Sequence, residues 1–198
     1  MPKMQATSST LVCLSLSLHA ASAAAQSLSG GITIKVSNTI TPAQPSAMIE
    51  FWGWFTPVPG TADLFSGVNT TVSASEPGWN ASSLGSPSGI LHSPINPVGG
   101  KFQIIAGQPH FPPAGVFGNP SNPLLLFWVE WSATSFSKRT IDLTTDSKGV
   151  GVVNMAGVTI NIPPGSVSEG SAEIHVVPSP APLALLCLAP LLARRRRA

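Results

Sequence analysis

The sequence contains no tyrosine, only two cysteines and few charged residues. Charged side chains make up 9% of the 198 positions, against roughly 25% in an ordinary soluble domain. This scarcity argues against a nucleic-acid binder, which needs a basic surface, and against a long solvated helical bundle. Apolar residues still reach 43%, too many for a chain that is disordered along its whole length. The length is that of one domain with a core of its own.

Both cysteines and half of the basic residues fall near the two ends of the chain. Cys13 and Cys187 lie in segments that we interpret as processing signals, so the domain between them would carry no disulfide and no cysteine-based metal site. Lys3 and an arginine block account for five of the ten basic residues; the block is Arg194, Arg195, Arg196 and Arg197. The rest of the chain holds five basic and eight acidic residues, a formal charge of −3.

Residues 1–25 have the layout of a secretory signal peptide. Lys3 supplies a positive start, residues 11–18 form a modest apolar stretch, and three alanines end at Ala25. Small residues after an apolar run are typical of a signal peptidase site, which we place between Ala25 and Gln26. The sequence therefore predicts export and an encounter with signal peptidase.

The C-terminal segment combines a proline-rich motif, a short hydrophobic run and a basic stop. The motif is Val177, Pro178, Ser179 and Pro180, and the eleven residues from Leu183 to Ala193 form the run. As a helix this run would reach about 16 Å, too short to span a membrane core of roughly 30 Å unaided. The arginine block should stay on the cytoplasmic side of the inner membrane. Together these features predict a transient membrane contact, with an ordinary C-terminal anchor as the alternative.

This layout resembles the PEP-CTERM sorting signal of Gram-negative bacteria, with Ser179 in place of the glutamate at the centre of that motif. The resemblance covers about residues 177–197. It implies an exported protein that is handled by exosortase, a membrane protease and transpeptidase, often in species that make exopolysaccharide. Pro190 inside the hydrophobic run is a second departure from the family pattern. The implied localisation is secreted or associated with the cell envelope.

Between the two ends, residues 27–177 predict an all-β domain. Short β-rich runs alternate with Gly, Pro, Asn and Ser, and no long helical period occurs. We expect nine strands in an antiparallel β-sandwich of the jelly-roll or immunoglobulin-like kind, or a barrel; they are residues 31–37, 47–56, 68–74, 101–105, 124–136, 140–144, 150–155, 158–162 and 172–177. The tail from 178 to 198 would follow as a short hydrophobic helix. Residues 76–100 are expected to form the least ordered stretch, since 16 of these 25 residues are Gly, Pro, Ser or Asn.

The strands at 47–56 and 124–136 form the expected centre of the sandwich. Side chains alternate between the two faces of a strand, so the odd positions of both runs should point into the core and Glu50 and Glu130 should point outward. Gly53 is expected to mark a bulge or a close approach of another backbone.

Three tryptophans provide the best candidate for a binding site. In the same phase, Trp52, Trp54 and Trp128 share the outward side with the two glutamates. Flat indoles beside carboxylates suit the stacking of sugar rings, and exopolysaccharide would be a fitting ligand. The alternative is that this face is covered as well, so that all three tryptophans belong to the core.

The sequence has no recognisable catalytic, cofactor or metal motif. There is no nucleophile elbow, no zinc-protease motif and no phosphate loop. Asp142 and Asp146 flank a threonine pair that could hold calcium, but a solvated turn explains them better because calcium needs six to eight oxygens. Glu50 and Glu130 could be imagined as the paired carboxylates of a glycoside hydrolase. We therefore predict a non-enzymatic surface or extracellular-matrix protein, with a carbohydrate-binding module as the alternative and a hydrolase as the third possibility.

Overall fold

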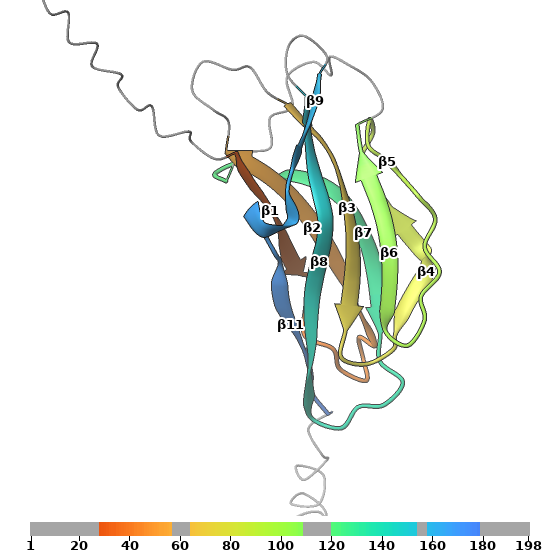
Figure 1. Cartoon of the computed structure of the whole chain (residues 1–198). Coiled ribbons are helices and arrows are strands. Elements are labelled where there is room, and N and C mark those ends of the chain that lie inside the picture. The colour runs from red at the N-terminus through yellow and green to blue at the C-terminus, as the bar shows by residue number, and fades with distance from the viewer. Residues whose placement is uncertain (1–27, 57–63, 109–119, 154–157, 179–198) are drawn as a thin grey trace, which may run out of the picture.

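The computed structural model describes residues 28–56, 64–108, 120–153 and 158–178, and in this part of the chain the protein is a two-layer β-sandwich (Figure 1). One sheet, sheet A, has the strand order β10-β1-β2-β7-β4. The other, sheet B, has the order β11-β8-β3-β6-β5, with β9 paired to β8. The predicted antiparallel sandwich is confirmed, while the signal peptide and the hydrophobic tail lie outside the described residues. Among the residues described, no helix is long and apolar enough to cross a membrane.

The strands are short at the edges of the sheets and long in the middle. Sheet A consists of β1 (Ser29–Val36), β2 (Ser46–Thr56), β4 (Trp79–Gly85), β7 (Leu124–Ser132) and β10 (Val167–Ser168). Sheet B consists of β3 (Leu64–Ala74), β5 (Leu91–His92), β6 (Lys101–Gly107), β8 (Arg139–Val153), β9 (Thr159–Ile162) and β11 (Ser171–Val176). A 3-10 turn, η1 (Pro164–Ser166), precedes β10. Strand β1 starts at one end of the sandwich and β11 ends at the other (Figure 1).

The core lies between the two sheets, and the expected phase is confirmed for β2 and for β7 from Phe127 to Trp131. Leu125, expected in the core, is only partly buried and pairs with the outward Trp52. The odd positions of β2 are buried, and Phe51 stacks on Phe127 with ring centroids 4.4 Å apart. The pairing of β2 with β7 shifts by one residue after Phe51, which leaves Leu126 as an extra, buried residue. Gly53 lies beside this β-bulge. Of the two expectations for this glycine, the bulge is present and the close backbone approach is not: a Cβ there would sit 2.6 Å from the ring of Phe65.

Strand β8 corrects two predictions made from sequence. Residues 140–144 and 150–155 were expected to be separate strands with a solvated turn between them, yet Arg139–Val153 is one continuous strand. Its pairing with β3 skips Lys148, because Asn69 pairs with Gly149 and Thr70 with Ser147. A β-bulge of this kind reverses which positions face the core, and the sequence then loses its regular alternation. Asp142 and Asp146 both lie exposed on the strand, not in a turn.

The stretch 76–100 is more ordered than its composition indicated. It contains β4 and β5, and β4 forms the free edge of sheet A beside β7. The indole of Trp79 donates a hydrogen bond of 2.8 Å to the carbonyl of Gly100 and packs edge-on against Phe102. These contacts tie the strand to the opposite sheet.

Candidate binding surfaces

The outer face of sheet A brings together every predicted platform residue. Trp52, Trp54 and Trp128 all lie on this face, each partly buried, and none belongs to the core cluster. The three tryptophans therefore share the outward side with Glu50 and Glu130, as expected, and none of them is fully buried.

Two of the indoles are laid against glycines of the neighbouring strands. Gly31 on β1 pairs with Trp54, and a Cβ at Gly31 would lie 2.6 Å from Cζ2 of that indole. Gly85 on β4 pairs with Trp128, and a Cβ there would lie 2.7 Å from Cε2 of that ring. Since a Cβ stands out from the sheet, both rings cover the backbone of their glycine. Sequence reasoning missed these two glycines because the cross-strand register was unknown.

The third tryptophan is held by charged neighbours. The ammonium of Lys35 lies 4.0 Å from the ring centre of Trp52, and the indole N–H of Trp52 donates to Oε2 of Glu50 over 3.0 Å. Trp52 also borders a cavity of about 530 Å³, which the loop residues 87–90 and residues 122–125 at the start of β7 help to line. The ring is thus oriented by partners on both β1 and β2.

Glu50 and Glu130 are diagonal neighbours on adjacent strands but have separate partners. Glu50 lies opposite Trp128, and Glu130 lies opposite Met48. The hydroxyl of Ser46 and the amide of Asn80 hydrogen-bond to Glu130, and these bonds hold the pKa of its carboxyl below the ordinary value. A glycosidase acid must keep its proton near neutral pH, which requires a raised pKa. Glu130 is therefore shifted in the direction opposite to that of an acid catalyst.

The histidines of the described chain do not assemble with other ligating groups. His92 contacts the carbonyl of Ser93, and His175 lies 3.8 Å from the carboxylate of Glu173 on the exposed side of β11. His110 lies outside the described residues. Within the described ranges, no three His, Cys, Asp or Glu side chains come together as a metal site would require.

The predicted processing residues fall mostly outside the described chain. Ala25, Gln26, Ser179, Pro180 and the arginine block all do so. Val177 and Pro178 are described, and both are exposed directly after β11 ends at Val176. The amide of Val177 still donates to the carbonyl of Ile40 over 2.9 Å. The motif therefore starts at a residue that is still hydrogen-bonded to the sandwich.

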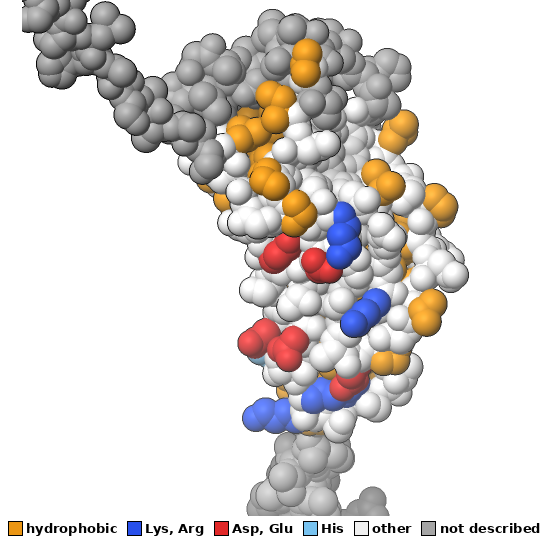
Figure 2. Space-filling view, viewed as in Figure 1, with side chains coloured by type: hydrophobic (Ala, Val, Ile, Leu, Met, Phe, Trp, Pro, Cys, Tyr) orange, Lys and Arg blue, Asp and Glu red, His pale blue; other side chains and the backbone are white. Residues whose placement is uncertain are grey.

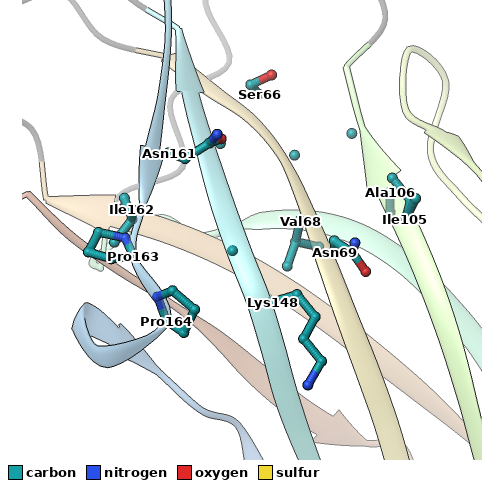
Figure 3. Close-up of a pocket in the computed structure, with 14 residues that line it drawn as sticks. Ser66, Val68, Asn69, Ile105, Ala106, Lys148, Asn161, Ile162, Pro163 and Pro164 are labelled. Atoms are coloured by element: carbon teal, nitrogen blue, oxygen red, sulfur yellow. The ribbon is translucent and has the colours of Figure 1, made fainter.

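A second concave surface, not anticipated from the sequence, lies on the outer face of sheet B (Figure 3). We call it the glycine groove. Its volume is about 470 Å³, and Ile105 forms one wall while Pro163 and Pro164 form the other (Figure 3). The floor between these walls carries no side chains at four positions: Gly67, Gly107, Gly149 and Gly151.

The glycine groove lies in an uncharged part of its face. Lysines, arginines and acids gather toward the lower half of the view in Figure 2, near the end of β11. Of the residues that line the groove, Lys148 alone among those described is charged, and its ammonium is paired with Asp146 at 2.9 Å. Leu91 and Ile105, both more than half exposed, stand on the same face beside the groove.

Comparisons with known proteins show similarity in backbone fold only. No protein-family model matches this chain. No curated protein matches it either. Among solved structures, it is similar to a cohesin module of a family 33 glycoside hydrolase from Clostridium perfringens, with 14% identity, a TM-score of 0.45, and coverage of 77% of this chain and 100% of the other. It is also similar to the sixth cohesin of scaffoldin B from Acetivibrio cellulolyticus, solved with a dockerin, at 10% identity and a TM-score of 0.43, covering 75% of this chain and 99% of that one. A type I cohesin from Pseudobacteroides cellulosolvens has 14% identity and a TM-score of 0.42, covering 76% and 94% of the two chains.

Proposed function

We propose that this chain is an exported, non-enzymatic surface or extracellular-matrix protein that is sorted through its PEP-CTERM-like tail. The observation that carries the proposal is the position of the motif. The last strand ends at Val176, and the exposed Val177 and Pro178 follow with no intervening linker. A membrane enzyme that recognises residues 177–180 would therefore bind its motif directly beside the folded domain, and cleavage there would leave the sandwich intact.

The structure of the sandwich agrees with a passive module. Its outer faces carry aromatic rings, amides and glycines, and hydrogen bonds from Ser46 and Asn80 lower the pKa of Glu130, which favours its charged form. Signal peptidase and an exosortase-like enzyme are the processing partners that this proposal requires. Contact with the inner membrane would be transient or retained through the hydrophobic run 183–193.

Scrambling residues 178–182 in the full chain should change where the protein is found. We expect loss of surface display or of normal release, because the processing enzyme would no longer recognise its motif. Cell fractionation and mass spectrometry of the exported protein measure this, since the masses report both termini at once. The matched control replaces Pro94 and Pro97, which lie in a loop of the sandwich, with alanine. Sorting by the tail is excluded if the scrambled protein is displayed and released like the parent.

A second candidate function is carbohydrate binding by the outer face of sheet A. It is favoured by the two indoles that lie over Gly31 and Gly85, because a ring that covers the backbone with one face turns the other toward solvent. Sugar rings present C–H faces that stack on such a surface. The same sheet also carries Lys35 on β1, Glu50 on β2 and Asn80 on β4. These polar side chains could hydrogen-bond to the hydroxyl groups of a sugar.

If the face binds a polysaccharide, Trp52→Ala and Trp54→Ala should each weaken binding about tenfold, the factor that corresponds to roughly 1.4 kcal/mol of lost stacking. A glycan array followed by affinity electrophoresis with purified exopolysaccharide gives the measurement. Trp52→Phe serves as the control because it keeps a stacking ring without the indole N–H. Absence of binding to every polysaccharide tested would remove this candidate and leave the sorting proposal untouched.

A further inference from the structure

Two flat indoles mark the ends of a diagonal across the outer face of sheet A. A Cβ on Gly85 would lie 2.7 Å from each of three successive atoms of the Trp128 indole, Nε1, Cε2 and Cζ2. No point in the plane of the ring is equally far from all three at that distance, so Trp128 lays a face of its ring on the glycine. At the other end the indole of Trp54 covers Gly31, where a Cβ would lie 2.6 Å from Cζ2 and 2.8 Å from Cε2. Each ring is therefore held against the sheet and leaves its other face for a ligand.

The strand register gives the distance between these two ends. Gly31 on β1 pairs with Trp54, which lies four residues after Glu50 on β2. Gly85 on β4 pairs with Trp128, and Trp128 pairs in turn with Glu50. Four residues along β2 and three strand spacings from β1 to β4 are each about 14 Å, which puts the two glycines about 20 Å apart. A ligand that contacts both indoles must therefore be long and extended.

The middle of the diagonal is hollowed. Trp52 lies midway between Glu50 and Trp54 along β2, and it pairs with Leu125 on β7. This pair borders the cavity of about 530 Å³, a volume within the roughly 300–1,000 Å³ that is usual for small-ligand sites. Lys35 reaches the Trp52 ring from β1, whereas the cavity lies on the side of β7. An elongated ligand on the diagonal would thus pass over an aromatic-walled cavity between the two flat rings.

A hydrogen-bonded turn closes the far side of this cavity. Residues 87–90 follow β4 and line the cavity across from Trp52. The N–H of Ile90 donates to the carbonyl of Pro87 over 3.1 Å, and Gly89 has a φ of +86°, as the third residue of a type II turn requires. The amide of Gln108 adds a polar group to walls that are mostly apolar. Such a site accepts the C–H face of a sugar ring together with a few of its hydroxyl groups.

The charges of sheet A disfavour an acidic ligand. In the described strands of this sheet the charged residues are Lys35, Glu50 and Glu130, and the residues that line the cavity are uncharged. Two carboxylates thus stand beside the diagonal against one ammonium. Hydrogen bonds from Ser46 and Asn80 also lower the pKa of Glu130, which favours its charged form. A chain of uronic acids would be repelled here, whereas a neutral sugar chain would not.

We propose that the outer face of sheet A binds a neutral, extended polysaccharide chain along the diagonal from Trp54, through the cavity at Trp52, to Trp128. The inference rests on the carbohydrate-binding candidate above and names its substrate class. Chains of β-1,4-linked neutral hexoses have the required shape, because equatorial bonds at both ends of each ring carry the chain straight on, whereas α-1,4-linked chains coil. A proline-rich peptide fits less well, since such peptides dock in aromatic-lined grooves, and the two outer indoles lie flat and about 20 Å apart.

Titration calorimetry of the exported protein with oligosaccharides of increasing length tests this path. The probes are neutral β-1,4-linked oligomers of glucose, mannose and N-acetylglucosamine, from two to eight units long. Affinity should rise with length until the chain reaches both outer indoles and should then level off. Trp54→Ala and Trp128→Ala should each weaken binding of the hexamer about tenfold and leave the affinity of the dimer, which the central cavity holds, unchanged. Trp52→Ala should weaken dimer and hexamer alike.

A glycine variant tests the placement of one ring without removing an indole. In Gly85→Ala the added methyl group would collide with the Trp128 indole and tilt it off the sheet, so the hexamer should lose affinity as in Trp128→Ala while the dimer does not. The matched control is Gly165→Ala in η1, because a Cβ at Gly165 would meet no atom within 4 Å. This control should bind both oligomers like the parent.

The outcomes separate this inference from the candidate function on which it rests. If the dimer binds as tightly as the hexamer, carbohydrate binding stands and the extended path is wrong. Equal affinity for α-1,4-linked glucose oligomers or for β-1,4-linked uronate oligomers would likewise overturn the substrate class, as would a proline-rich peptide that binds in a Trp54- and Trp128-dependent manner while the sugars do not. Failure of every glycan to bind would remove the candidate function itself and this inference with it.

Discussion

Replacing Phe51 with alanine should lower the free energy of unfolding by about 3–5 kcal/mol, the usual cost of deleting a fully buried phenylalanine ring. Phe51 is 0% exposed and stacks on Phe127 between the two central strands of sheet A. Because the ring is fully buried, its deletion leaves a cavity that the surrounding side chains fill only in part. Chemical denaturation of the exported protein, followed by tryptophan fluorescence, provides the measurement.

The neighbouring residue supplies the control. Trp52 is larger than Phe51 but lies on the outer face of the same strand. Trp52→Ala removes the contact with Lys35 and the hydrogen bond to Glu50, and as a surface change it should cost about 1 kcal/mol. If the Trp52 variant proved the less stable of the two, the orientation of β2 would be wrong.

This pair also illustrates what could be predicted from the sequence. Strand side chains alternate strictly, so a run with phenylalanine, alanine and isoleucine at one parity and charged residues at the other fixes its own orientation. In β2 and β7 that parity predicted which side chains are buried, from Ala47 to Phe55 and from Phe127 to Trp131. The same argument placed the three tryptophans on one face.

The alternation argument fails where the chain inserts a residue. In β8 the buried positions are odd up to Ser147 and even from Val150 onward, because Lys148 is the extra residue of a bulge. The sequence therefore resembled two strands with a turn between them. A bulge is specified by pairing with the neighbouring strand, and this pairing is not visible in the sequence of one strand.

Strand β4 was missed for a different reason. Trp79–Gly85 is rich in serine and glycine, which have low strand propensity. It is held in place by the hydrogen bond of Asn80 to Glu130 and by Trp128 lying over Gly85. Both contacts join residues more than 40 positions apart, so local composition could not reveal them. The glycine groove was missed likewise, since its floor exists only once β3, β6 and β8 are side by side.

Glu169→Ala should lower the free energy of unfolding by about 2–3 kcal/mol, because it leaves buried donors without an acceptor. Glu169 lies between β10 and β11, and its carboxylate accepts bonds of 2.7 Å from the Thr145 hydroxyl and 2.9 Å from the Ser147 hydroxyl. It also accepts the backbone N–H of Ser147 over 2.8 Å. Thr145 and Ser147 face the core and are at most 6% exposed. The loss of stability is measured by denaturation alongside the Phe51 variant.

The control for Glu169 is Glu173→Ala, which removes an exposed carboxylate of β11 whose nearest ionisable neighbour, the His175 imidazole, lies 3.8 Å away. This change should stay within about 0.5 kcal/mol of the parent, as surface substitutions usually do. Glu169→Gln keeps one acceptor oxygen and should fall between the alanine variant and the parent. Equal losses in the Glu169→Ala and Glu173→Ala variants would mean that Thr145 and Ser147 find other partners. A larger loss in the Glu169→Ala variant would show that this carboxylate stabilises the sandwich by accepting hydrogen bonds from the buried Thr145 and Ser147 of β8.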